Sequence, residues 1–164
     1  KNTFQVTGSF TMQGRSVRSG VPVTLTDTLV PALFGPFNAV SNNNLSGNVI
    51  FTAVEDGTYT ITTNQPRYLN VSVLADTANG ITKTKAISAA TILTSLQLKG
   101  GNANDADNIV DVSDAGVVAG GWGTGTISHN GDVNFSGAVD ILDLSLVGAN
   151  YNMTSASAYG SWTP

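Results

Sequence analysis

Side chains that carry oxygen recur at regular intervals in residues 131–151, which read GDVNFSGAVDILDLSLVGANY. When Asp132 is counted as position 1, these side chains occupy positions 1, 3, 5, 9 and 12, and Gly137 occupies position 6. EF-hand calcium loops have this spacing, because alternate side chains and one main-chain carbonyl then converge on the ion. The sequence therefore predicts a calcium site formed by Asp132, Asn134, Ser136, the carbonyl of Ala138, Asp140 and Asp143.

A second copy of this segment lies upstream. VDVSDAGVVAGGWG at 110–123 aligns with VDILDLSLVGANYN at 139–152 at a fixed offset of 29 residues, which indicates an internal duplication. The upstream loop matches the calcium spacing once one residue is inserted, and Asp105 is then an alternative to the residue at position 3. We expect weaker binding or altered geometry there, with ligands from Asn102, Asn104, Asp107, the carbonyl of Ile109, Asp111 and Asp114.

The distribution of charge favours a bound metal ion. All seven basic residues lie before residue 100, and seven of the eleven acidic residues lie after it, so residues 100–164 carry a net charge of −7. A hard cation is the simplest counterion for carboxylates that have no basic residue in their own segment. The chain has no basic patch of the kind that binds nucleic acid.

The remaining sequence predicts the elements that position these loops. Short β-branched segments separated by Gly, Pro and Asn predict a β-sandwich over residues 1–98. The expected strands are 3–10, 21–26, 48–54, 57–63, 68–76, 81–88 and 90–98, and 28–47 is expected to be a long apolar loop. A second domain, 99–164, is expected to place a short helix after each calcium loop. In the second of these helices, we expect the buried face to be formed by Ile141, Leu144, Leu146 and Val147.

Two families share these motifs. GNVIFTAVEDGTYTITTNQPRYLNVSV at 47–73 resembles the carboxypeptidase regulatory-like, or transthyretin-like, sandwich family over residues 4–98. The duplicated loops resemble the dockerin family over residues 99–152. The resemblances imply a fold that is mainly β, with an Ig-like or transthyretin-like β-sandwich followed by a small α-helical dockerin-like domain that carries two Ca²⁺ ions.

The dockerin resemblance also implies a partner. Dockerins bind cohesin domains and anchor proteins in extracellular assemblies, and their partner contacts include loop positions 10 and 11. Here these positions hold Val112-Ser113 and Ile141-Leu142, which are more apolar than the Ser/Thr pairs typical of dockerins carried by enzymes.

The sequence argues against catalysis. The chain has no cysteine, one histidine and no paired nucleophile and base. No stretch is long and apolar enough to span a membrane. The sequence therefore predicts a non-catalytic, extracellular or cell-surface protein whose partners are proteins.

Three functions are consistent with this prediction. In the first, the chain is a self-assembling subunit of a surface fibre or layer, in which the N-terminal strand, through Phe4 and Val6, adds to a sheet edge of another copy. In the second, the duplicated half docks onto a cohesin-bearing scaffold. In the third, the chain is a carbohydrate-binding adhesin that uses a sandwich face or the aromatic residues Trp122, Tyr151, Tyr159 and Trp162.

Overall fold

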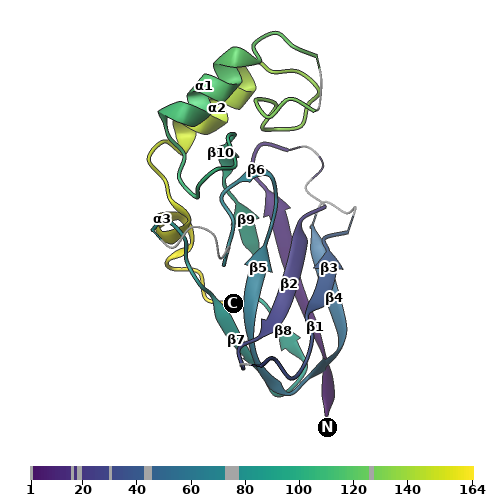
Figure 1. Cartoon of the computed structure of the whole chain (residues 1–164). Coiled ribbons are helices and arrows are strands. Elements are labelled where there is room, and N and C mark those ends of the chain that lie inside the picture. The colour runs from purple at the N-terminus through teal and green to yellow at the C-terminus, as the bar shows by residue number, and fades with distance from the viewer. Residues whose placement is uncertain are drawn as a thin grey trace.

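The computed structural model describes residues 2–15, 17, 20–29, 31–42, 46–72, 78–125 and 128–164. The described chain is mainly β and includes three helices (Figure 1). Its strands are β1 Thr3–Met12, β2 Pro22–Asp27, β3 Phe37–Val40, β4 Asn48–Glu55, β5 Gly57–Thr63, β6 Arg67–Tyr68, β7 Thr84–Ile87, β8 Thr91–Ile92, β9 Leu96–Leu98 and β10 Gly100–Asn102. Its helices are α1 Val112–Gly120, α2 Ile141–Ala149 and α3 Ser155–Tyr159.

Two sheets form the predicted β-sandwich. One has the order β4-β1-β8, with β9 also paired to β1, and the other has the order β3-β2-β5-β7. Apolar side chains alternate along the strands, so that Val6 and Phe10 of β1 and Leu25 and Ile61 of the other sheet are all fully buried in one core. A third, two-stranded sheet of β10 and β6 connects the sandwich to the duplicated half.

The N-terminal strand is not free to add to a neighbouring sheet. β1 pairs antiparallel with β4, and on its other side it pairs parallel with β8 and β9. Val6 is fully buried and Phe4 is half-buried against the same core. The predicted partner contact is therefore wrong for Val6, because β4 and β8 occupy both edges of β1 at that residue, whereas at Phe4 the described strands occupy only the β4 edge.

Some expected strands differ from those observed. β3 lies within residues 28–47, which were expected to form a loop, and it pairs with β2 from Pro22↔Val40 to Leu25↔Phe37. The expected strand 68–76 is represented by the short β6, and residues 73–77 lie outside the described part of the chain. The expected strand 90–98 is divided into β8 and β9 by residues 93–95.

The duplicated half has approximate twofold symmetry in its backbone pairing. α1 and α2 lie side by side at one end of the molecule (Figure 1). Val139, before α2, exchanges hydrogen bonds with Gly123 and Thr124, which follow α1. Val110, before α1, exchanges the equivalent bonds with Asn152 and Met153, which follow α2. The residue before each helix thus hydrogen-bonds to the segment that follows the other helix, so the two repeats hold each other in place.

The C-terminal segment returns to the sandwich. The Tyr159 hydroxyl donates to the Leu69 carbonyl at 2.8 Å and accepts from the Lys99 amide at 2.9 Å. The Trp162 ring packs edge-on against Phe10, and its indole N–H donates to the Thr94 carbonyl. The buried side chains of the sandwich and of residues 103–162 therefore form one continuous core. Within the described residues, no helix is long and apolar enough to cross a membrane.

Candidate functional site

The second predicted loop is closed around two buried aspartates. The Asp132 carboxylate accepts from the amides of Ser136 and Gly137 at 2.9 and 3.0 Å. The Asp143 carboxylate accepts from the amides of Asn134 and Asp140 at 2.9 and 3.0 Å. Asp132 and Asp143 are 0% exposed, so two carboxylates of this loop are withdrawn from water. The loop is therefore closed by four main-chain amides that donate to the carboxylates of positions 1 and 12.

The first predicted loop repeats this pattern. The Asp114 carboxylate accepts from the amides of Asn104 and Asp111, as Asp143 does from those of Asn134 and Asp140. The turn bond from the Asp105 amide to the Asn102 carbonyl corresponds to that from Phe135 to Asp132. The distance along the chain from Asn104 to Asp114 is one residue longer than that from Asn134 to Asp143. The hydrogen bonds therefore place one additional residue in the first loop and make Asn102 equivalent to Asp132.

Left-handed backbone occurs at position 4 of both loops. Asp105 has φ 54° and Phe135 has φ 56°, and Gly137 has φ 95° at the position that the motif reserves for glycine. Asn108, the residue of the first loop that corresponds to Gly137, is not left-handed. The additional residue accounts for this difference, because it lets the first loop turn without a left-handed residue at that point.

The oxygen groups fit a hard cation, although the carboxylates are spread apart. Among the described residues, no three His, Cys, Asp or Glu side chains gather as a metal-binding group. Asp140 and Asp111 instead cap α2 and α1 by accepting from the amides of Leu142 and Ser113. Position 9 of an EF-hand loop commonly reaches the ion through water, and amide and carbonyl oxygens supply the other ligands.

One buried oxygen in the first loop has no partner. Asn102 is 2% exposed, and its side-chain Oδ1 has no hydrogen-bond partner among the residues that the structure describes. Burial of an unpartnered amide oxygen costs about 1–3 kcal/mol, and a cation at this position would offset that cost. The donor types and this oxygen therefore fit a Ca²⁺ ion, which Asn102, Asn104, Asp107, Asp111 and Asp114 would hold together with the Ile109 carbonyl.

Two arginines of the sandwich lie beside the second loop. The guanidinium groups of Arg15 and Arg67 lie 4.1 and 4.2 Å from the centre of the Phe135 ring. Arg67 also donates from Nη1 to the Asp132 carbonyl at 2.7 Å. Burial lowers the pKa of both guanidinium groups, and the negative charge of Asp132 opposes that shift. The acidic half therefore has cationic neighbours, which the distribution of charge along the sequence does not reveal.

The residues predicted to contact a partner lie at the starts of the two helices. Ile141 and Leu142 are each 59% exposed, and Trp122 is 52% exposed just before Gly123, which hydrogen-bonds to Val139 at the entry to α2. We call Trp122, Ile141 and Leu142 the α2 patch. The equivalent α1 patch is formed by Val112, Ser113 and Tyr151, and it is less apolar because Ser113 takes the position of Leu142. The Ser113 hydroxyl donates to the Asp111 carboxylate and accepts from the side-chain amide of Asn104.

Four aromatic residues are candidates for sugar binding by their sequence, and the structure places them in two different settings. Tyr159 and Trp162 belong to the core, so neither is available to a ligand. Trp122 and Tyr151 are about half exposed and form part of the two patches. Their shared position, one residue before the backbone crossing of the repeats, is visible in the sequence as an aromatic pair in the duplication.

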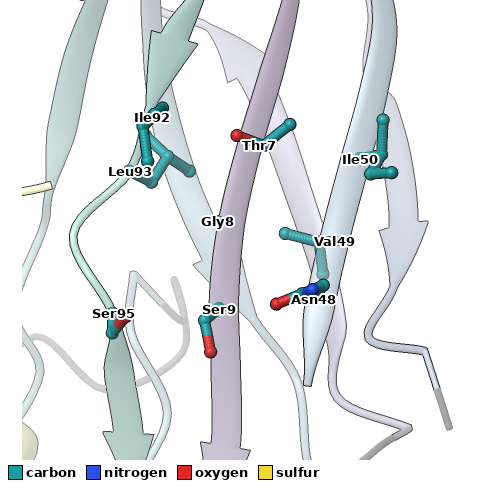
Figure 2. A pocket seen from close by; sticks show the side chains of 9 residues that line it. All are labelled: Thr7, Gly8, Ser9, Asn48, Val49, Ile50, Ile92, Leu93 and Ser95. Atoms are coloured by element: carbon teal, nitrogen blue, oxygen red, sulfur yellow. The ribbon is translucent and has the colours of Figure 1, made fainter. Parts of the chain in front are cut away.

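The sandwich carries a separate hollow of about 350 Å³ on the sheet of β4, β1 and β8 (Figure 2). Ile50 and Ile92 lie on either side of it at 55% and 81% exposure, and both pair with Thr7 of β1. The hollow lies at the interruption between β8 and β9, where Leu93 and Ser95 leave the regular ladder. Its lining has hydroxyl, amide and aliphatic groups but no titratable side chain.

Comparison with known structures shows similarity over nearly the whole chain. The chain is similar to a chain in each of two mutants of a type II Cohesin-X-Dockerin complex from Acetivibrio cellulolyticus, an N-terminal and a C-terminal interface mutant, with TM-scores of 0.66 and 0.65 and identities of 18% and 17%. Each match covers 93% of this chain and 98% of the other. A DUF3823 family protein from Parabacteroides merdae matches 60% of this chain and 46% of its own, at 17% identity and a TM-score of 0.42. No family model matches the sequence, and no curated protein matches it. At these identities the similarity establishes the fold.

Proposed function

We propose that the chain is a non-catalytic, extracellular module that loads two calcium ions and docks onto a cohesin-type domain through its α2 patch. The observation that carries this proposal is the exposure of Trp122, Ile141 and Leu142 together at the end of a duplicated, loop-closed helix pair. Aromatic and aliphatic anchors of this kind dominate the binding energy of protein interfaces.

The choice of partner rests on the whole-chain similarity to a member of a Cohesin-X-Dockerin complex. The α2 end is favoured as the contact because Leu142 takes the position that Ser113 holds at the α1 end, and a leucine removes more apolar surface from water when a partner covers it.

Calcium supports docking by ordering the ends of the helices. Asp140 and Asp143 belong both to the second loop and to the capping box of α2, so an ion held by this loop would also hold the first turn of the helix. Ile141 and Leu142 lie in that turn. Calcium removal is therefore expected to loosen the docking surface.

Binding to cohesin domains tests the proposal. We expect immobilised type I and type II cohesin domains to retain the full chain in calcium but not in chelator. The double substitution Ile141→Ser and Leu142→Ser should abolish retention, whereas Ile50→Ser and Ile92→Ser, at exposed positions of the sandwich, should leave it unchanged. The proposal fails if no cohesin retains the wild-type protein, or if the α2 variant binds as well as the wild type.

Self-association is a second candidate, favoured by the hollow between Ile50 and Ile92 (Figure 2). This surface and the helices lie toward opposite ends of the molecule (Figure 1), so contact between the two would be heterologous and would extend into a fibre. Sedimentation and negative-stain microscopy in calcium separate the two candidates, because a monomer at all concentrations excludes self-association but not cohesin docking.

A further inference from the structure

Arg67 lies between the two loops and contacts both. Its guanidinium donates to the main-chain carbonyl of Asp132, at position 1 of the second loop, and stacks on Phe135, at position 4. Its backbone amide donates to the Asp105 carboxylate, at position 4 of the first loop, at 2.5 Å. Through the pairing of β6 with β10, its backbone also faces Asn102, at position 1 of that loop. One sandwich residue thus contacts the equivalent pair of positions in each loop.

The local structure of Arg67 is unusual for a long side chain. Its φ is 69°, in the left-handed region that residues other than glycine seldom adopt, and it is only 6% exposed. Left-handed backbone at a bulky residue persists where surrounding contacts hold it in place, and such residues are concentrated at functional sites. Here these contacts come from both loops. Movement of one loop would therefore shift Arg67 and, with it, the contact that Arg67 makes with the other loop.

We propose that Arg67 couples the two loops, so that calcium bound in one loop raises the affinity of the other. This inference rests on the proposed calcium binding. An ion that fixes Asp132 and Phe135 also fixes the guanidinium, and the backbone of Arg67 then holds Asp105 and Asn102 in the arrangement that the first loop needs. Because binding of the first ion has already ordered the other loop, binding of the second ion there costs less free energy of ordering.

Arg15 provides a matched control. Its guanidinium lies over Phe135 at nearly the same distance as that of Arg67, although Arg15 is less buried. Among the described residues, it contacts Phe135 and Met12 and not the first loop. Arg15→Met and Arg67→Met each remove one positive charge from beside the second loop. Repulsion between that charge and calcium changes in both variants, whereas the connection between the loops is lost only in Arg67→Met.

The experiment is a calcium titration of the full chain by calorimetry, with and without Asp114→Asn to disable the first loop. In the chain with Arg67 intact, we expect Asp114→Asn to lower the calcium affinity of the second loop about tenfold, within the range of typical couplings. In Arg67→Met, the same substitution should change that affinity by less than about twofold, and Arg15→Met should retain the wild-type coupling. Asp105→Ala breaks the connection at an exposed residue and serves if Arg67→Met does not fold.

The outcomes separate this inference from the proposed function. Absence of calcium uptake by the wild type overturns both. Calcium uptake in which the second loop has the same affinity with and without Asp114→Asn overturns the coupling alone. Coupling that persists in Arg67→Met or Asp105→Ala overturns the role of Arg67. Coupling that disappears equally in Arg15→Met also overturns it and assigns the effect to general charge.

Discussion

At the scale of single residues, Tyr159 shows how one side chain attaches the C-terminal segment to the sandwich. Its hydroxyl donates to Leu69 and accepts from Lys99, and its ring is 1% exposed. Burial raises the pKa of this phenol, and burial also raises the pKa of Tyr68, whose hydroxyl donates to the Gln13 carbonyl. Both side chains therefore remain neutral in the folded protein at a pH where they ionise in the unfolded chain.

From the raised pKa values of these two tyrosines, we expect the folded protein to lose stability at alkaline pH. Because the folded-state pKa lies above the ordinary value of 10.0, the unfolded chain loses its protons first as the pH rises through about 10. The free energy of unfolding should then fall by about 1.4 kcal/mol per tyrosine for each further pH unit. Denaturant titrations across this range test the slope, which Tyr159→Phe should reduce by about 1.4 kcal/mol per pH unit. An unchanged slope in that variant would exclude Tyr159 as its source.

At the scale of elements, α2 has one exposed and one buried face, although apolar residues occur on both. Ile141, Leu142 and Leu144 are exposed, whereas Asp143, Leu146 and Val147 are buried. The expectation that Ile141 and Leu144 belong to the buried face is wrong. Gly14 and Gly100 of the sandwich side approach Leu146 closely, so the register of the helix is set by this contact and by the capping box.

A matched pair of alanine substitutions tests the two faces of α2. Leu146→Ala should lower the free energy of unfolding by about 2–5 kcal/mol, because it leaves a cavity against the sandwich. Ile141→Ala should change it by less than about 0.5 kcal/mol, since that side chain is exposed. Chemical denaturation of both variants in calcium measures the difference, and equal losses would contradict the observed orientation of the helix.

At the scale of the whole molecule, the β-sandwich and the duplicated half share one core. Val110, Val133 and Tyr159 belong to the same buried cluster as Val6 and Phe10. The boundary expected between residues 98 and 99 stays a prediction about sequence organisation, and side-chain contacts cross that position. Lys83 and Lys85 add to them by donating to the carbonyls of Gly160 and Pro164.

This shared core predicts how the protein responds to calcium removal. If two ions bind, each should add about 2.7 kcal/mol to the stability at a hundredfold excess over its dissociation constant. Chelator should therefore lower the melting temperature, and both halves should unfold in one transition because their side chains pack together. Asp132→Asn should reproduce part of the loss. Calorimetry that resolves two separate transitions would show that the halves unfold independently, and an unchanged melting temperature in chelator would argue against calcium binding.

Local patterns in the sequence carried much of the information about the strands and the loops. Alternating apolar residues indicated most of the sandwich strands, because one face of each strand must be buried. The duplication indicated both loops and the additional residue in the first, because the chain positions of ligand residues follow from the geometry of a tight turn. Whether these loops bind calcium stays a prediction.

Only the tertiary structure decided which surfaces are free. β1 appeared available as a terminal strand, yet pairing with residues 48–55 on one side and 91–98 on the other makes it an inner strand. Trp162 and Trp122 are similar in sequence terms, but one is buried against Phe10 and the other is exposed beside α2. The position of Arg67 between two loops distant in sequence also depends on long-range packing. Local periodicity reports which faces must be buried, whereas contacts between distant segments determine what covers them.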